Sequence, residues 1–146
     1  MATTLQRLES LTAEDGARIA APLLEFNERA GPPMKTEPVA IALDHDGARV
    51  EGGLWGEIVY DWLHVEIVAV PDRLRGAGVG KGLMREAERI ALAAGCRGVW
   101  LDTFSFQARH FYESLGYAVV GMIPDHPRNG CRYFMSKTLT GGSAGA

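Results

Sequence analysis

The 146-residue chain has only two cysteines, Cys96 and Cys131, and neither stands in a CxxC or Cys/His spacing. A zinc site and a disulfide framework are therefore not indicated. The sequence also lacks a run of roughly 18 apolar residues, which a membrane-spanning helix requires. Its polar start, Met1 to Thr4, has no apolar core of a signal peptide. We therefore expect a cytoplasmic protein with no membrane partner and no metal.

An excess of positive charge is absent as well, because 15 Lys and Arg face 18 Asp and Glu, for a formal net charge of −3. This balance argues against nucleic acid as the main partner. The length and an apolar content of 47% are sufficient for one hydrophobic core. We expect a single domain over residues 1–140, followed by a flexible C-terminal tail over residues 141–146.

Glycine, in contrast, is concentrated between basic residues in the run Arg73-Leu74-Arg75-Gly76-Ala77-Gly78-Val79-Gly80-Lys81-Gly82-Leu83-Met84. Glycine lets the backbone approach a ligand closely and turn its N–H groups inward, and a following helix directs its positive end at an anion. The run therefore predicts a phosphate-binding loop. The alternative is a turn without a ligand, for which four glycines in seven residues would cost unnecessary backbone entropy.

Spacing separates the kinds of phosphate loop. A Walker A loop needs glycine where Arg75 stands and a hydroxyl where Gly82 stands, and the fingerprint G-x-G-x-x-G needs glycine at Lys81 or Leu83. Both patterns fail. The pattern [QR]-x-x-G-x-[GA] fits twice, over residues 73–78 and 75–80.

Strand-like and helical segments alternate around this loop. An apolar, β-branched stretch over residues 62–70 precedes it, and apolar residues at helical spacing follow it up to Gly95. We further predict a first helix from Thr12 to Ala30, a short helix over 108–115, and strands over 39–43, 48–54, 55–60, 98–103, 117–122 and 131–139. The alternation indicates an α/β sheet.

A second motif occupies the short helix. Residues 108–117 match A-x-x-x-Y-[ED]-x-x-G-[FY]. With the loop pattern, in this order and at this spacing, the chain resembles the GNAT superfamily of acetyl-CoA-dependent N-acetyltransferases. The resemblance implies an α+β fold with a mixed, mostly antiparallel central sheet flanked by helices, whose central parallel strands splay apart. It also implies acetyl-CoA as a cosubstrate.

The resemblance assigns cofactor-binding residues. Val68 and Val70 would pair through their backbone with the pantetheine arm, and Ser105 stands where family members often place an asparagine. The pyrophosphate would lie on the glycine-rich loop, for which the predicted residues are Arg73, Arg75, Gly76, Ala77, Gly78, Val79, Gly80 and Lys81.

The chemistry needs a base, because an alkyl amine with a pKa of about 10.4 is almost entirely protonated at neutral pH. His64 and Glu66 are two residues apart on a predicted strand, so alternation places both on one face with Val68 and Val70. Either could take the proton, although His64 could be only a hydrogen-bonded strand residue and Glu66 part of an ion pair. The resemblance implies that Tyr112 protonates the departing CoA thiolate. Alternatively, Tyr112 is a packed aromatic residue without a chemical role.

The resemblance implies a primary amine as the acceptor, and a small molecule, a peptide and a protein all stay open as its source. The resemblance places its pocket near residues 26–37 and 125–132. Trp55, Tyr60 and Trp62 fit either a homodimer contact near a sheet edge or the core. A non-catalytic sensor that binds CoA is the alternative to an enzyme.

Overall fold

The computed structural model describes residues 1–140. The expected tail over 141–146 lies outside the described residues. Contacts divide the chain into two compact units, one over Met1–Met34 and one that begins at Lys35. The expectation of one domain over 1–140 stays a prediction, and each unit is described by itself.

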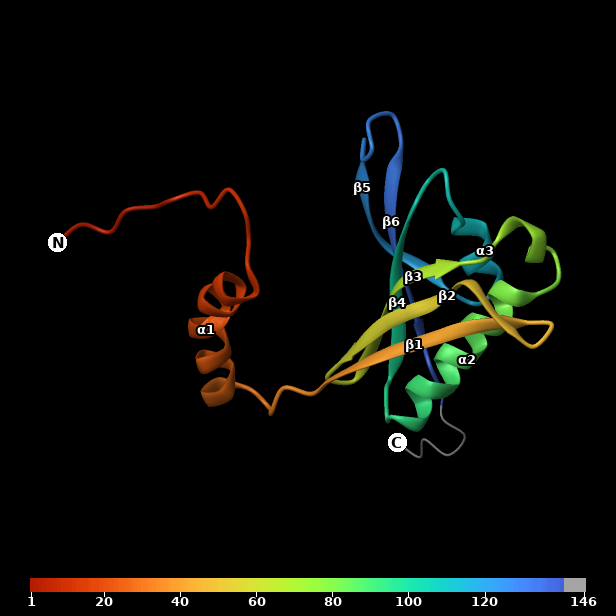
Figure 1. Cartoon of the computed structure of the whole chain (residues 1–146), viewed down its shortest axis with the longest axis horizontal. Helices are drawn as coiled ribbons and strands as arrows, with labels where there is room; N and C mark the ends of the chain where they lie inside the picture. The colour runs from red at the N-terminus through yellow and green to blue at the C-terminus, as the bar shows by residue number, and fades with distance from the viewer. Residues whose placement is uncertain (141–146) are drawn as a thin grey trace. The chain divides into compact units, whose positions relative to one another are not determined.

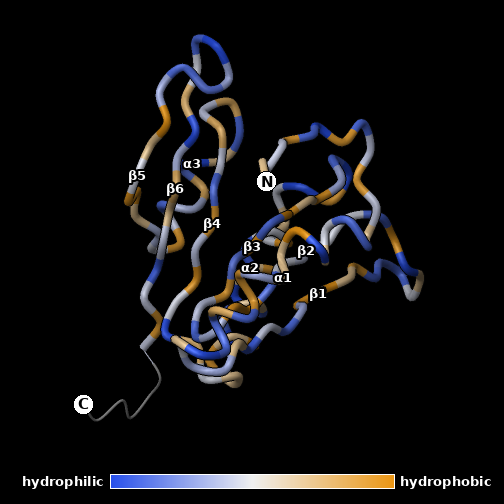
Figure 2. Tube along the Cα trace, turned by 90° about the vertical axis from the view of Figure 1, so that its left-hand side faces the viewer, coloured by the Kyte–Doolittle hydropathy of each residue, from blue (hydrophilic) through white to orange (hydrophobic). Residues whose placement is uncertain are grey.

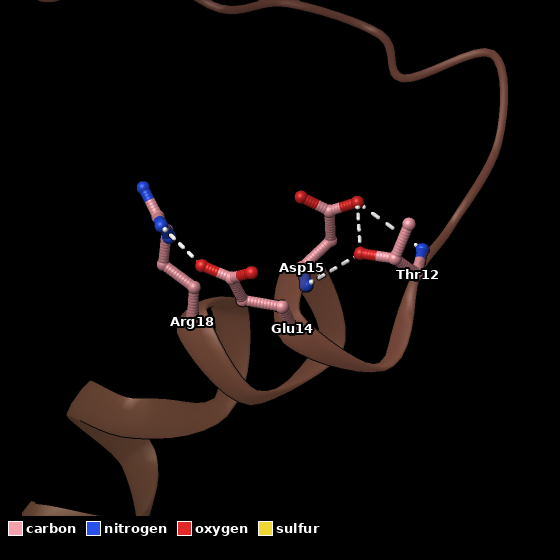
Figure 3. A network of polar contacts seen from close by, with 4 residues as sticks. All are labelled: Thr12, Glu14, Asp15 and Arg18. Carbon is pink, nitrogen blue, oxygen red and sulfur yellow. Dashed lines mark hydrogen bonds and ion pairs between the residues drawn. The ribbon is translucent and has the colours of Figure 1, made fainter.

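The first unit contains helix α1, Ala13–Ala30, which confirms the predicted helix. Its start is fixed by a capping box (Figure 3), in which the Asp15 backbone N–H donates to Thr12 Oγ1 at 3.1 Å and the Thr12 N–H donates to Asp15 Oδ2 at 3.1 Å. Reciprocal bonds of this kind satisfy backbone donors that have no partner inside the helix. Arg18 pairs with Glu14 at 3.1 Å one turn further on.

The second unit is built on a six-stranded sheet with the order β1-β2-β3-β4-β6-β5. Only β3 and β4 are parallel neighbours, so the predicted mixed, mostly antiparallel sheet is confirmed. The strands are β1 Thr36–His45, β2 Ala48–Val59, β3 Trp62–Ala69, β4 Gly98–Phe104, β5 Ala118–Pro124 and β6 Cys131–Thr138. The separate strand predicted over 55–60 was wrong, because β2 continues through a bulge at Gly52 and Gly53, which have φ of 97° and 130°.

Two helices cover one face of this sheet (Figure 1). Helix α2 spans Val79–Ala93 and helix α3 spans Arg109–Ser114. Met84 of α2 and Tyr112 of α3 share one buried cluster with Leu101 of β4 and Met135 of β6. Among the described residues, no helix is both long and apolar enough to cross a membrane.

The two parallel strands separate part-way along their length. Residues 62–65 of β3 pair with residues 98–101 of β4, and the last pair joins Val65 to Leu101. Beyond it β4 turns away from β3 together with β5 and β6, a divergence that can be followed in Figures 1 and 2. The edge of β3 that faces β4 is therefore without a strand partner from Glu66 onward.

A β-bulge in β3 changes which side chains share a face. Gly56 of β2 pairs with Val65 and Trp55 pairs with Ile67, so Glu66 is the extra residue. Leu63 and Val65 face the core before the bulge, and Val68 packs against the same core after it. The expectation that His64 shares a face with Val68 and Val70 was therefore wrong, because a bulge shifts the alternation by one residue.

The tryptophans expected near an edge lie inside the sheet. Trp55 belongs to β2 and Trp62 to β3, and both strands have neighbours on either side. The Trp62 ring covers Gly98, where a Cβ would lie 2.3 Å from ring atoms. The edge position was therefore wrong, while the homodimer itself stays a prediction.

A polar network ties α2 to the sheet. Glu88 lies beneath Tyr117 and Lys137; its Oε1 accepts a hydrogen bond from the Tyr117 hydroxyl at 3.0 Å and one from Lys137 Nζ at 3.0 Å. The Glu88 side chain is 14% exposed and that of Lys137 29%. Removing the carboxylate would leave two partly buried donors without an acceptor.

We expect Glu88→Ala to lower the free energy of unfolding by about 2 kcal/mol, as hydrogen bonds to a charged group are removed. Urea unfolding measures the change. The control is Glu86→Ala on the same helix, whose pair with Arg89 is well exposed and contributes less than about 1 kcal/mol. Equal losses of unfolding free energy in the two variants would show that the burial of Glu88 does not increase its contribution to stability.

Candidate functional site

A pocket of the second unit opens where β3 and β4 part and has a volume of about 740 Å³. This size is in the usual range for small-molecule sites. It extends from the glycine-rich loop to α3 and is lined by Val68, Val70, Leu74, Arg75, Gly76, Gly78, Val79, Gly80, Lys81, Phe106, Gln107, Ala108, Phe111 and Tyr112.

The glycine-rich loop leads directly into the N-terminus of α2. Gly76 and Gly78 have φ of 81° and 79°, a left-handed conformation that favours glycine, and Gly78 is the N-cap residue of the helix. No atom lies within 4 Å of the position that a Cβ of Gly78 would take. Lys81 makes no ion pair within residues 1–140. The free N–H groups of the first helical turn and this cation suit an anionic ligand.

The two arginines before the loop have partners of their own. Arg73 makes a bidentate pair with Glu51 of β2 and does not line the pocket. Arg75 lines the pocket, but its Nε donates to the Val70 carbonyl at 3.1 Å and its Nη1 lies 3.1 Å from Asp72. In this structure the arginines anchor the loop to the sheet, so Arg73 as a cofactor ligand stays a prediction.

The anchor between Arg73 and Glu51 is insensitive to pH over the neutral range. Hydrogen bonds from Arg73 lower the pKa of the Glu51 carboxyl from 4.5 to about 2. Because this pKa is lowered by folding, the pair stabilises the folded protein above about pH 4.5 and loses its contribution as the pH falls through about 2. Both partners of this exposed pair are therefore charged at neutral pH.

Ser105 lies outside the main pocket. It lines a neighbouring hollow of about 340 Å³, and its hydroxyl oxygen accepts a hydrogen bond from the Cys131 N–H at 3.0 Å. Ala77 is not among the residues that line the main pocket. Sequence reasoning missed Phe106, Gln107 and Phe111 in the lining. Their position immediately before and within the second motif is the feature that could have identified them.

Tyr112 closes the far end of the pocket. It comes from α3 and is 9% exposed, with its ring edge-on to Phe111 and Tyr117. Burial, and in second place the charge of Asp102, raises the pKa of its phenol above 10.0. Its hydroxyl has no hydrogen-bond partner within residues 1–140 and is available to a ligand in the pocket. A neutral phenol in this position can donate a proton.

Glu66 stands where the two parallel strands separate. It is the bulged residue of β3, follows Val65 directly and is exposed. Its Oε2 accepts a hydrogen bond from the indole N–H of Trp55 at 2.9 Å. One carboxylate oxygen is therefore held by Trp55, and the other has no partner within the described residues.

His64 lies on the face of the sheet opposite to α2 and α3. Its ring stacks on the Trp100 indole, with centroids 3.6 Å apart and planes 3° from parallel. Its Nε2 lies 4.0 Å from Asp102 Oδ1. The structure thus places Tyr112 and Val68 on one side of the opening and His64 on the other.

Neither cysteine lines the main pocket. Cys96 is buried in the core, and burial raises the pKa of its thiol above 9.0. Among residues 1–140 no group of three or more His, Cys, Asp and Glu side chains is placed to hold a metal ion.

Comparison with known proteins gives concordant matches. Residues 6–117 match the model of the Acetyltransferase (GNAT) family. A blasticidin-S acetyltransferase from Streptomyces morookaense is 31% identical over 140 residues, which cover 93% of this chain and 98% of that protein.

Solved structures show the same fold. An acetyltransferase from Bacillus cereus is 31% identical with a TM-score of 0.80, and the match covers 92% of this chain and 98% of that protein's chain. A putative acetyltransferase from Agrobacterium tumefaciens is 27% identical with a TM-score of 0.84, and the match covers 95% of this chain and 100% of that protein's chain. The fold of this chain is therefore shared with solved acetyltransferase structures.

Proposed function

Because the chain belongs to the GNAT family of acetyltransferases, we propose that it moves an acetyl group from acetyl-CoA to a primary amine by direct attack in a ternary complex. One observation carries the proposal: a single pocket joins the glycine-rich N-terminus of α2 to the phenol of Tyr112 at the point where β3 and β4 separate. A donor with an anionic end and a reactive end fits such a pocket.

The donor would use the backbone more than side chains. Its pyrophosphate would accept hydrogen bonds from the N–H groups at the start of α2, where Gly78 lets the chain turn and Lys81 adds a positive charge. Its pantetheine amides would pair with the edge of β3 at Val68 and Val70, which has no partner in β4. The thioester then lies beside Glu66 at one end of the unpaired edge.

The transfer needs three proton movements. The acceptor ammonium gives a proton to Glu66 or His64, which later passes it to solvent, and the neutral nitrogen attacks the thioester carbonyl. As the carbon–sulfur bond breaks, the thiolate takes a proton from the Tyr112 hydroxyl. The nitrogen loses its second proton as the amide forms, and this proton restores the Tyr112 hydroxyl through solvent. A backbone N–H near Val68 would stabilise the negative charge on the carbonyl oxygen.

A small-molecule amine is the acceptor that the relatives favour. The blasticidin-S acetyltransferase is named for a small antibiotic, and its match extends over nearly its whole length. The exposed Trp55 and Glu66 offer an aromatic surface and a negative charge beside the opening, which suit a cationic amine. A cytoplasmic location and the acceptor segments 26–37 and 125–132 stay predictions.

The proposal is tested by calorimetric titration with acetyl-CoA, with ATP and NAD as controls, followed by a thiol-release assay over a panel of amines. We expect selective binding of acetyl-CoA and release of CoA thiol with at least one amine. Binding of CoA without transfer to any amine would favour the sensor instead. Absence of acetyl-CoA binding would overturn the assignment of the loop and, with it, the enzyme.

A further inference from the structure

Asp102 is a carboxylate that the sequence analysis did not identify, and it stands at the opening between the strands. It follows Leu101, the last residue of β4 that pairs with β3. Arg132 of β6 donates to Asp102 Oδ2 from Nε at 2.7 Å, and its Nη2 lies 2.7 Å from the same oxygen. The other oxygen, Oδ1, faces Nε2 of His64 at 4.0 Å. The two oxygens thus have different partners.

Arg132 fixes the orientation of Asp102. Its guanidinium lies 5.3 Å from the ring centroids of Phe104 and Phe134, which flank it on the same face of the sheet. The side chains of Asp102 and Arg132 are only 20% and 32% exposed. A carboxylate held by a stacked arginine cannot turn freely, so Oδ1 remains directed at His64.

The environment of the His64 ring distinguishes its two nitrogens. Within residues 1–140, Nε2 is the buried side-chain nitrogen or oxygen that lacks a hydrogen-bond partner. Nδ1 has no protein partner there either but is not buried, so it is open to solvent. A lone pair on Nε2 would repel the facing carboxylate, whereas an N–H on Nε2 is attracted to it. The favourable neutral tautomer therefore carries its proton on Nε2 and its lone pair on Nδ1.

We propose that Asp102 is a positioning residue that holds His64 in the Nε2–H tautomer, so that Nδ1 accepts the proton of the acceptor ammonium. This inference rests on the proposed function. In the step, an N–H bond of the ammonium breaks and an Nδ1–H bond forms, which leaves a neutral amine and an imidazolium. The imidazolium faces Asp102 and the Trp100 ring, both of which stabilise a cation. The imidazolium later returns its proton to solvent.

Other charged groups also surround His64. Glu57 of β2 is its direct cross-strand partner, Glu66 lies two residues further along β3, and Arg132 lies behind Asp102. Glu57 makes no hydrogen bond or ion pair within the described residues. It therefore provides a matched control, because its removal deletes a nearby negative charge without releasing a partner of His64.

The first test is nitrogen-15 NMR of the imidazoles, which shows the nitrogen that carries the proton. The chain has four histidines, and His64→Gln assigns the signal of His64. We expect the Nε2–H tautomer alone in the unmodified protein and a mixture of tautomers in Asp102→Asn. Glu57→Gln should keep the single tautomer. An Nδ1–H tautomer in the unmodified protein would overturn the inference without any use of enzyme activity.

The second test is kinetic. We expect Asp102→Asn to lower kcat by about 100-fold, the lower range for a lost proton-transfer contribution, and to leave the KM for acetyl-CoA within about twofold, because Asp102 does not line the donor pocket. Glu57→Gln should change neither. In a His64→Gln background, Asp102→Asn should have no further effect on kcat.

The outcomes separate this inference from the proposed function. Unchanged kcat in Asp102→Asn, with an unmodified protein that acetylates amines, would overturn the positioning role alone. Failure of the unmodified protein to acetylate any amine would overturn the proposed function, while the NMR result would still decide the tautomer. Thermal unfolding would show whether Asp102→Asn folds. If it does not, the spectrum of the unmodified protein still tests the inference, because an Nδ1–H tautomer of His64 would overturn it.

Discussion

Gly78→Glu will abolish the binding of acetyl-CoA, with a loss of affinity of more than about 100-fold. Gly78 is the N-cap residue of α2 with φ of 79°, and it lines the pocket. A Cβ there would meet no atom within 4 Å, so we expect the glutamate carboxylate to occupy the site proposed for the pyrophosphate. It would also occupy the positive end of the helix. Calorimetric titration measures the affinity.

Gly95 supplies the control for backbone strain. Its φ is 83°, it also has no atom within 4 Å of a Cβ position, and it follows the opposite end of α2. Gly95→Glu should lower stability to a similar degree, because both variants force a left-handed conformation on a side chain at roughly 1–2 kcal/mol. Its affinity for acetyl-CoA should be unchanged. Retained affinity in Gly78→Glu would disprove the phosphate role of the loop.

Tyr112→Phe will lower kcat by roughly 100- to 1,000-fold and leave the Kd for acetyl-CoA within about twofold. The change removes one hydroxyl that has no protein partner within residues 1–140 and keeps the buried ring in its packing. Burial raises the pKa of this phenol above 10.0, so the proton is present at neutral pH and is lost only as the pH rises through the raised pKa. Steady-state kinetics and calorimetry together measure the two parameters.

Tyr117→Phe is the matched control. Tyr117 is also buried, but its hydroxyl donates to Glu88 at 3.0 Å and does not line the pocket. We expect lower stability and unchanged kcat in this variant. Equal turnover in Tyr112→Phe and the unmodified protein would remove Tyr112 from the chemistry.

The local features of the fold could be predicted because each depends on a few neighbouring residues. Thr12 and Asp15 define a helix start, Gly95 follows a helix end, and the glycines between Arg73 and Met84 indicate a turn that leads into a helix. The mixed, mostly antiparallel sheet followed from the family resemblance, and the structure confirms it.

Register could not be predicted in the same way. The bulge at Glu66 depends on the pairing of β3 with Gly56, where a Cβ would lie 2.2 Å from the His64 carbonyl oxygen. Nothing in the alternation of β3 itself reveals an inserted residue. The sequence analysis therefore placed His64 on the wrong face.

The contact of His64 with Asp102, and that of Asp102 with Arg132, could not be predicted for a related reason. Asp102 and Arg132 are 30 positions apart and meet only because β4 and β6 pair. Arg73 has a distant partner of the same kind. The loop motif predicted a cofactor contact for Arg73, but its pairing with Glu51 of β2 could not be predicted from the residues around the loop.

The two faces of β3 carry different residues. Before the bulge its polar side chains lie on the face of His64, and after it Val68 and Val70 line the pocket on the opposite face. Substitutions on the His64 face can therefore accumulate without altering the donor side. On the proposed function, a change of acceptor would therefore need substitutions on the His64 face alone, while the residues proposed to hold the cofactor stay the same.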